Sequence, residues 1–226
     1  MLPTIVLVGR PNVGKSTLFN CLSNAKAQSA NFPFCTIEPN IGVVNVPDSR
    51  MARLEELVKP ERVQMATVDI VDIAGLVKGA SKGEGLGNKF LANIREVSAI
   101  IHVIRCFEDE NVLREEGVIN PISDKEIIET ELQLKDLDSV EKKMQRTEKM
   151  AKTDPKAKAE LAVLQQCKAH LEQGKSIRSL GLSKEERVAI ADIFLLTEKP
   201  VMYVANVDEK SMHTGNAYSE KLVAMA

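Results

Sequence analysis

The chain has 226 residues, 44% of them hydrophobic, with 30 basic and 32 acidic side chains and a formal net charge of −2. This near balance produces no whole-molecule field that would attract DNA or a membrane surface, so neither is an expected partner. No apolar run approaches the length of a membrane span, the N-terminus lacks a basic-then-apolar signal, and the four cysteines form no C-x-x-C pair. We therefore expect a monomeric, cytoplasmic protein with reduced thiols.

Residues 9–17, GRPNVGKST, match the phosphate-binding P-loop pattern G-x-x-x-x-G-K-[ST]. The apolar run at 5–8 predicts a buried strand before it, and residues 18–22 open a helix after it. Such a turn directs backbone N–H groups at a polyphosphate, and the helix N-terminus adds its positive dipole end. A glycine-rich turn that binds nothing is the disfavoured alternative. The residues predicted to bind nucleotide here are Asn12, Val13, Gly14, Lys15, Ser16 and Thr17.

Two side chains of this loop have predicted roles in catalysis and metal binding. Lys15 can reach the β- and γ-phosphates, and the Ser16 hydroxyl can ligate Mg²⁺. Downstream, the loop at 31–40 contains Thr36, which we predict to complete the magnesium shell when triphosphate is bound. The alternative for Thr36 is a hydroxyl that only caps the backbone.

A second phosphate-sensing element follows the predicted strand at 67–72, which ends in a D-x-x-G sequence. Asp72 is predicted to hold the magnesium shell, and the backbone N–H of Gly75 to meet the γ-phosphate. Five glycines lie in the next stretch, 75–87, which suits a switch that orders on triphosphate binding, with an inert flexible loop as the alternative. The predicted catalytic set is Lys15, Thr36 and Gly75, and the predicted metal set is Ser16, Thr36 and Asp72.

The position after D-x-x-G is Leu76, whose apolar side chain cannot orient an attacking water molecule. Water must then be positioned by backbone groups, the glycine-rich loop, a monovalent cation or a partner. Asn12 is either a ligand for K⁺ or a residue that braces the P-loop, and the sequence leaves both open. His102 lies in the apolar strand predicted at 99–104, so we interpret it as a packed core histidine rather than a base.

The character of the chain changes from about residue 122. Residues 126–152 are charge-rich and helical, the helix breaks at 153–155, and a second helix covers 157–171. Spacings of three and four predict an antiparallel coiled-coil hairpin. We therefore predict a P-loop nucleotide-binding domain at 1–121 and 182–226 and a helical insertion at 122–181. Its charged faces suit solvation, with a ribosome or nucleic-acid contact as the alternative. The positions predicted to repeat at these spacings and form the seam between the two helices are Leu137, Val140, Met144, Thr147 and Ala151 in the first helix, then Ala157, Leu161, Leu164, Lys168 and Leu171 in the second.

A helix predicted at 183–197 returns to the nucleotide-binding domain, a strand follows at 202–205, and a last helix begins at 218. After that strand come Asn206, Val207, Asp208 and Glu209, where GTPases carry the guanine-reading N-K-x-D. Val207 replaces the lysine and Glu209 replaces the aspartate. These changes disfavour guanine, because the carboxylate and lysine that would contact it are altered and unpaired buried polar groups cost about 1–3 kcal/mol. The alternative is a slipped motif in which Asp208 only caps a helix.

Two long segments, NFPFCTIEPN at 31–40 and DIAGLVKGASKGEGLGNKFLANIREVSAIIHVIRCF at 72–107, carry a family resemblance. They resemble the Obg class of translation-factor-related GTPases and, within it, the YchF or Obg-like ATPase subfamily. Arg10 is a departure, because that subfamily usually has leucine there and the stretch is more similar to Der and Era ribosome-assembly GTPases. We expect the Arg10 side chain to point outward and phosphate binding to be retained.

This resemblance and the motifs imply an α/β P-loop NTPase, a Ras-like G domain with a mostly parallel sheet and an inserted helical hairpin. They imply adenine binding at the altered base motif, Mg²⁺ as cofactor, and slow, switch-like hydrolysis of ATP to ADP linked to the ribosome. An Obg/Der-like GTPase in ribosome assembly and a nucleotide-dependent binding module with negligible turnover stay open as alternatives. The subfamily continues with one more strand, a second base-contacting loop and a TGS domain, so we expect a G domain shortened at its C-terminal end.

Overall fold

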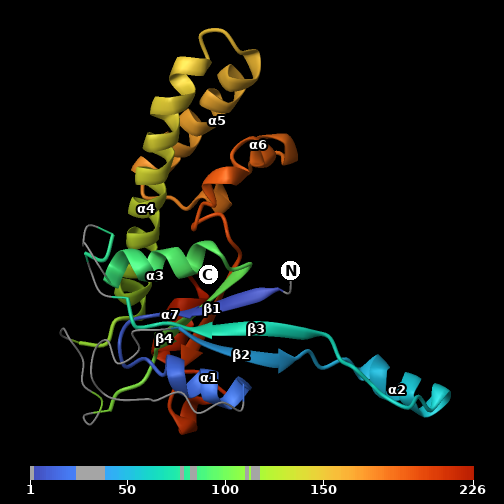
Figure 1. Ribbon diagram of the computed structural model, residues 1–226. Helices are drawn as coiled ribbons and strands as arrows, with labels where there is room; N and C mark the ends of the chain where they lie inside the picture. The colour runs from blue at the N-terminus through green and yellow to red at the C-terminus, as the bar shows by residue number, and fades with distance from the viewer. Residues whose placement is uncertain (1–2, 24–38, 77–78, 82–85, 110–111, 113–117) are drawn as a thin grey trace.

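The computed structural model describes residues 3–23, 39–76, 79–81, 86–109, 112 and 118–226. Its centre is a five-stranded sheet in the order β2-β3-β1-β4-β5, in which only the β2–β3 pair is antiparallel (Figure 1). The mostly parallel α/β sheet predicted from the P-loop is thereby confirmed. The strands are β1 (Thr4–Val8), β2 (Asn40–Asn45), β3 (Thr67–Asp72), β4 (Ala99–Arg105) and β5 (Val201–Asn206).

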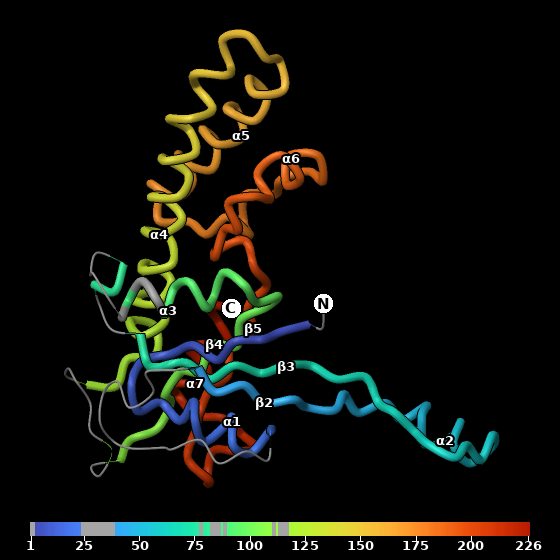
Figure 2. The backbone as a smooth tube through the Cα atoms, viewed as in Figure 1, coloured from blue at the N-terminus to red at the C-terminus, as the bar shows by residue number. Residues whose placement is uncertain are grey.

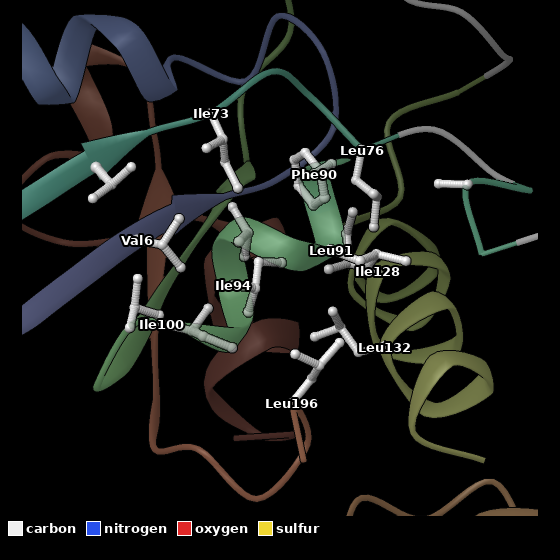
Figure 3. Packing of buried hydrophobic residues seen from close by; sticks show 14 residues of the cluster. Val6, Ile73, Leu76, Phe90, Leu91, Ile94, Ile100, Ile128, Leu132 and Leu196 are labelled. Carbon is white, nitrogen blue, oxygen red and sulfur yellow. The ribbon is translucent and has the colours of Figure 1, made fainter. Parts of the chain in front are cut away.

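Apolar residues face both sides of the sheet because helices cover both sides. In β1, Leu7 packs toward α1 (Lys15–Ser23), whereas Val6 packs toward α3 (Leu86–Arg95). This alternation follows from the two-residue period of a strand, and burial on both faces explains the continuous apolar run in β1. Figure 3 shows the core between the sheet and α3, where Val6 and Ile100 of the sheet lie beside Ile94 of α3.

Two long antiparallel helices, α4 (Pro121–Met150) and α5 (Pro155–Glu172), form the predicted hairpin (Figure 1). Asn120 and Asp154 cap their N-termini, and a proline follows each cap as the first helical residue. Val140 and Leu164 are fully buried in the seam, as predicted. The prediction that Lys168 lies in the seam is wrong. Its Nζ lies 2.7 Å from Glu141 Oε1 at the edge, and the neighbouring Cys167 is buried instead.

The first turns of α4 belong to the core of the G domain. Ile128 and Leu132 are buried in the same cluster as Leu91 of α3 and Leu196, which lies just before β5 (Figure 3). Farther along, Val140 belongs to a second cluster with α5 and the segment after it. The root of the hairpin is therefore continuous with the nucleotide domain, and its distal part has a core of its own.

The return segment differs from its prediction. In place of one helix at 183–197, α6 (Lys184–Ala189) is followed by a short 3-10 turn, and Phe194 adopts the left-handed conformation with φ 48°. An α-helix cannot continue through a residue in this left-handed conformation without strain. The last helix, α7 (Ala217–Val223), lies where the sequence predicts it.

Neither β2 nor α2 (Ser49–Val58) was predicted from the sequence. Figure 2 shows α2 at the far end of β2 and β3, extending away from the remainder of the molecule. Among the described cysteines, Cys106 and Cys167 are buried free thiols, and Cys21 is an exposed one. Over the same described ranges, no helix has both the length and the apolar character to cross a membrane.

Candidate nucleotide-binding site

The P-loop joins the end of β1 to α1 and is closely surrounded by backbone. A Cβ atom added to Gly9 would come 2.4 Å from the Val103 carbonyl oxygen, so only glycine fits there. Asn12 takes a left-handed conformation with φ 58°, and Gly14 does so with φ 94°. These conformations curl the loop ahead of α1, whose first residue is Lys15. The helix N-terminus therefore faces the loop, as phosphate binding requires.

Lys15 is buried, with its Nζ donating a hydrogen bond to the Arg10 carbonyl oxygen at 2.9 Å. Burial lowers the pKa of its ammonium group to about 8, and the nearby Asp72 carboxylate partly opposes this shift. A buried cation is attracted more strongly to an approaching polyphosphate than a solvated cation would be, because the effective dielectric constant around it is lower. This is the property that the P-loop lysine needs.

Ser16 and Asp72 meet across the end of β3, where Ser16 Oγ donates to Asp72 Oδ2 at 2.6 Å. Burial raises the pKa of the Asp72 carboxyl, and the Ser16 hydrogen bond and the Lys15 charge pull it back. Asp72 Oδ1 is also buried, with no hydrogen-bond partner among the residues that the structure describes. An unused oxygen beside a serine hydroxyl fits the outer shell of Mg²⁺.

The part of the chain that the structure describes offers few further ligands for a cation. Within the described ranges there is no group of three or more His, Cys, Asp or Glu side chains able to hold a metal. The donor set of Ser16 and Asp72 therefore suits Mg²⁺ that arrives with a triphosphate and keeps several waters. Thr36, the third predicted ligand, lies outside the described residues.

The D-x-x-G segment lies directly against the P-loop. The Leu76 N–H donates to the Gly9 carbonyl oxygen at 3.0 Å, and a Cβ atom on Gly75 would come 2.6 Å from the Pro11 nitrogen. This close packing places the Gly75 backbone beside the phosphate loop. The Leu76 side chain points into the core beside Leu91 and Ile128 and does not reach the site (Figure 3).

The altered base motif also contacts the P-loop. Asn206 Nδ2 donates to the Val13 carbonyl oxygen at 3.0 Å, and Val207 packs with Cys106 and other residues under the end of β4. Asp208 caps a short 3-10 helix, because its carboxylate accepts the Ser211 N–H at 2.8 Å. The capping foreseen for Asp208 is therefore present, and Glu209 next to it is exposed.

Arg10 does not point outward, contrary to expectation. Its side chain is 11% exposed, and its Nε lies 4.0 Å from Oδ1 of Asp124, in the first turn of α4. The negative charge of Asp124 on α4 attracts the guanidinium group to this inward position. No local pattern indicates such a contact, because the two residues are more than a hundred positions apart.

His102 is the packed core histidine that the sequence predicts. It is 2% exposed in β4, next to Tyr203 of β5. Burial, helped by the charges of Lys125 and Lys15, lowers the pKa of its imidazole to about 3. The ring is therefore neutral at physiological pH and serves in packing.

Comparison with known proteins agrees with this geometry. A family model described as 50S ribosome-binding GTPase matches residues 4–150. The chain belongs to this family. Two similar members are each named ribosome-binding ATPase YchF. The one from Escherichia coli O157:H7 is 55% identical over 97% of this chain and 61% of its own length. The one from Bacillus subtilis strain 168 is 48% identical over 98% of this chain and 62% of its own.

A solved structure extends the match to three dimensions. This structure, of the Schizosaccharomyces pombe YchF GTPase, is 38% identical to the chain and aligns with a TM-score of 0.80. The alignment covers 99% of this chain and 61% of the S. pombe chain. The resemblance to the YchF subfamily is thus confirmed. The chain spans about three fifths of the length of the relatives it matches.

Proposed function

We propose that the chain binds ATP with Mg²⁺ and hydrolyses it slowly to ADP and phosphate. The observation that carries this proposal is the meeting of Lys15, Ser16 and Asp72 between the P-loop and the end of β3. Lys15 would hold the β- and γ-phosphates, Ser16 would ligate the metal, and Asp72 would hold its shell. Bound Mg²⁺ would neutralise charge on the transferred phosphoryl group. The Gly75 N–H would sense the γ-phosphate, and Thr36 remains part of the proposed set.

The choice of adenine rests on the residues after β5. The Asn206 contact with Val13 sets this motif beside the P-loop, so the residues that follow Asn206 decide base recognition. The Asp208 carboxylate accepts the Ser211 N–H as a helix cap, so Glu209 is the carboxylate at the position of the aspartate that binds guanine in GTPases. Its longer side chain and the missing lysine at Val207 disfavour guanine. The two relatives named ribosome-binding ATPase support the same assignment.

Slow turnover follows from the core position of Leu76. With that side chain buried, it cannot orient water, so backbone groups, the glycine-rich loop at 79–87, K⁺ at Asn12 or a partner must complete the site. We propose the K⁺ role for Asn12 as the alternative to a bracing role. A comparison of hydrolysis rates in K⁺ and Na⁺ buffers decides between them, because a bracing residue gives equal rates.

We further propose the ribosome or a ribosomal subunit as partner, a cytoplasmic location and a monomeric state. The names of the family and of its two relatives support the partner. The hairpin supplies the surface. Its distal part carries exposed basic side chains and contributes no residue to the phosphate site. We keep the division into a G domain at 1–121 and 182–226 and an insertion at 122–181 as a proposal, in which the first turns of α4 also pack into the G-domain core.

The deciding experiment titrates ATP, ADP, GTP and GDP against the purified chain by calorimetry and measures phosphate release. We expect tighter binding of the adenine nucleotides and slow release of phosphate from ATP. A tenfold or greater preference for GTP would favour the GTPase alternative, which Arg10 and the description of the S. pombe relative as a GTPase support. Tight ATP binding without phosphate release would identify a nucleotide-dependent binding module instead.

A further inference from the structure

Glu131 of α4 is a buried carboxylate that binds backbone close to the phosphate-sensing segment. It is 4% exposed, and its Oε1 accepts the Gly79 N–H at 2.6 Å while its Oε2 accepts the Ser81 N–H at 2.7 Å. Both distances are those of charge-assisted hydrogen bonds. A buried carboxylate needs such donors because it has given up its water. Glu131 therefore fixes residues 79–81 at two points.

Apolar packing reinforces the same attachment. Ala80, between the two donors, is buried in the cluster that contains Ile128, about one turn before Glu131, and Leu132, the residue after it. On the other side, a Cβ atom on Gly87 of α3 would come 2.3 Å from the Ala80 carbonyl oxygen. The segment is thus held closely between α3 and α4.

Two such attachments follow the phosphate sensor Gly75 directly in the chain. Leu76, the next residue after Gly75, donates its N–H to Gly9 of the P-loop, and three residues later Gly79 donates its N–H to Glu131 of α4. So short a connection cannot move far at one end without disturbing the other. The backbone of Gly75 therefore has its position set by the P-loop and, through residues 79–81, by α4.

We propose that Glu131 is a positioning residue for triphosphate hydrolysis, which holds the Gly75 N–H where it meets the γ-phosphate. This inference rests on the proposed function. It also links the root of the hairpin to the segment that follows the phosphate sensor, so that a partner bound to the hairpin can act on turnover through α4. A diphosphate has no γ-phosphate, so the effect concerns ATP turnover and leaves ADP affinity unchanged.

The test compares Glu131→Gln with Glu126→Gln, a matched change at an exposed position of the same helix. Glutamine keeps the shape of the side chain but offers one acceptor oxygen and no charge. We expect kcat for ATP to fall about tenfold, the loss of one charge-assisted hydrogen bond, with ADP affinity within twofold. Amide hydrogen exchange at residues 79–81 should accelerate by a similar factor. Glu126→Gln should change none of these quantities.

Glu131→Asp is a second variant, which keeps the charge but withdraws it by one methylene group, and its kcat should lie between those of Glu131→Gln and wild type. Unchanged exchange at 79–81, or unchanged kcat, in folded Glu131→Gln would overturn the inference. So would an equal loss of ADP affinity, because that is the mark of a merely structural residue. Wild-type protein without turnover would overturn the proposed function first, and the exchange rates would then show separately whether Glu131 holds the segment.

Discussion

The side-chain amide of Asn206 donates to the Val13 carbonyl oxygen, although 193 positions separate the two residues. This hydrogen bond joins the last strand of the sheet to the first loop. A Cβ atom on Gly14 would come 2.5 Å from Asn206 Nδ2, so the asparagine also fills the space that a glycine leaves free. The proposed base motif and the P-loop therefore hold each other in place.

Removing this contact should weaken nucleotide binding. Asn206→Ala deletes one hydrogen bond, worth about 0.5–1.5 kcal/mol, so calorimetry should show ADP affinity lower by roughly threefold to tenfold. Gln133→Ala is the matched control, because Gln133 also donates an amide N–H to a backbone carbonyl, that of Gly174, at the base of the hairpin. The control should lose stability but keep its affinity. Equal affinities of the two variants would contradict a role for Asn206 in ordering the P-loop.

Base preference should move when the two altered positions are restored to the GTPase pattern. The double variant Val207→Lys, Glu209→Asp supplies the shorter carboxylate and the lysine stem that guanine recognition uses. We expect the ratio of ATP to GTP affinity to shift toward GTP by at least about tenfold, the scale of one buried polar group gained or lost. Glu209→Asp alone should shift the ratio less. A ratio that does not move in the double variant would place base recognition elsewhere.

Nucleotide binding should take up protons at mildly alkaline pH. The pKa of Lys15 is lowered to about 8 in the free protein, and bound phosphates favour its charged form and so raise that pKa. Below pH 7 the lysine is charged in both states, and between about 8 and the bound-state pKa only the complex is charged. Affinity for ADP should therefore fall by up to tenfold per pH unit above about 8. Calorimetry in buffers of different ionisation enthalpy measures the uptake directly.

The control for this pH dependence is Lys15→Ala, which has no group to titrate. It should bind nucleotide very weakly at every pH, because the phosphates lose their main cation. Affinity of the wild-type chain that stays constant from pH 7 to pH 9.5 would mean that Lys15 is already fully charged in the free protein.

The motifs near the phosphates could be predicted because they are local. Gly9 to Thr17 and Asp72 to Gly75 each place their chemistry within a few residues of one strand end, so sequence spacing suffices. The hairpin was equally predictable, since its own 3.6-residue period defines the buried seam. The hydrogen bonds that Glu131 and Asp136 accept could not be predicted in this way. A carboxylate in a charge-rich helix suggests a solvated face, and its donors lie about 50 and 60 positions away.

Asp136 should be one of the most important polar residues for stability. It is 1% exposed, its Oδ1 accepts the Leu196 N–H at 2.8 Å, and its Oδ2 accepts both the N–H and the hydroxyl of Thr197 at 2.7 Å. Asp136→Asn turns one oxygen into an NH₂ group that faces donors. Burial raises the pKa of this carboxyl, so the neutral amide recovers part of the desolvation cost. The unpaired donors outweigh that gain, and we expect a loss of about 1–3 kcal/mol.

Urea unfolding measures this loss. The control is Asp138→Asn, which removes a surface ion pair of Asp138 Oδ2 with Lys142 Nζ, 2.9 Å apart. Exposed pairs of this kind contribute about 0–1 kcal/mol, so this variant should unfold near the wild-type midpoint. Equal midpoints for the two variants would show that the buried bonds of Asp136 are weaker than their geometry indicates.

Shortening the hairpin should separate partner binding from nucleotide binding, provided that the cut spares the root of α4. Replacing residues 146–158 by a short Gly/Ser bridge removes the tip, where the two helices are already antiparallel and close, at a small cost in loop entropy. The Lys143–Glu160 ion pair just below the cut, at 2.9 Å, shows that the helix ends can be joined there. We expect nucleotide affinity within a few-fold of wild type and loss of co-sedimentation with ribosomes.

The wider deletion of residues 125–175 provides the contrast. It removes Ile128 and Leu132 from the G-domain core and leaves the donors of residues 79–81 and 196–197 without their carboxylates. Loss of even one buried Ile or Leu side chain costs about 2–5 kcal/mol, so this variant should not fold. A folded, nucleotide-binding protein after the wider deletion would mean that α4 is not integral to the G domain. Retained ribosome binding after the tip deletion would place the partner surface below residue 146 or on the G domain itself.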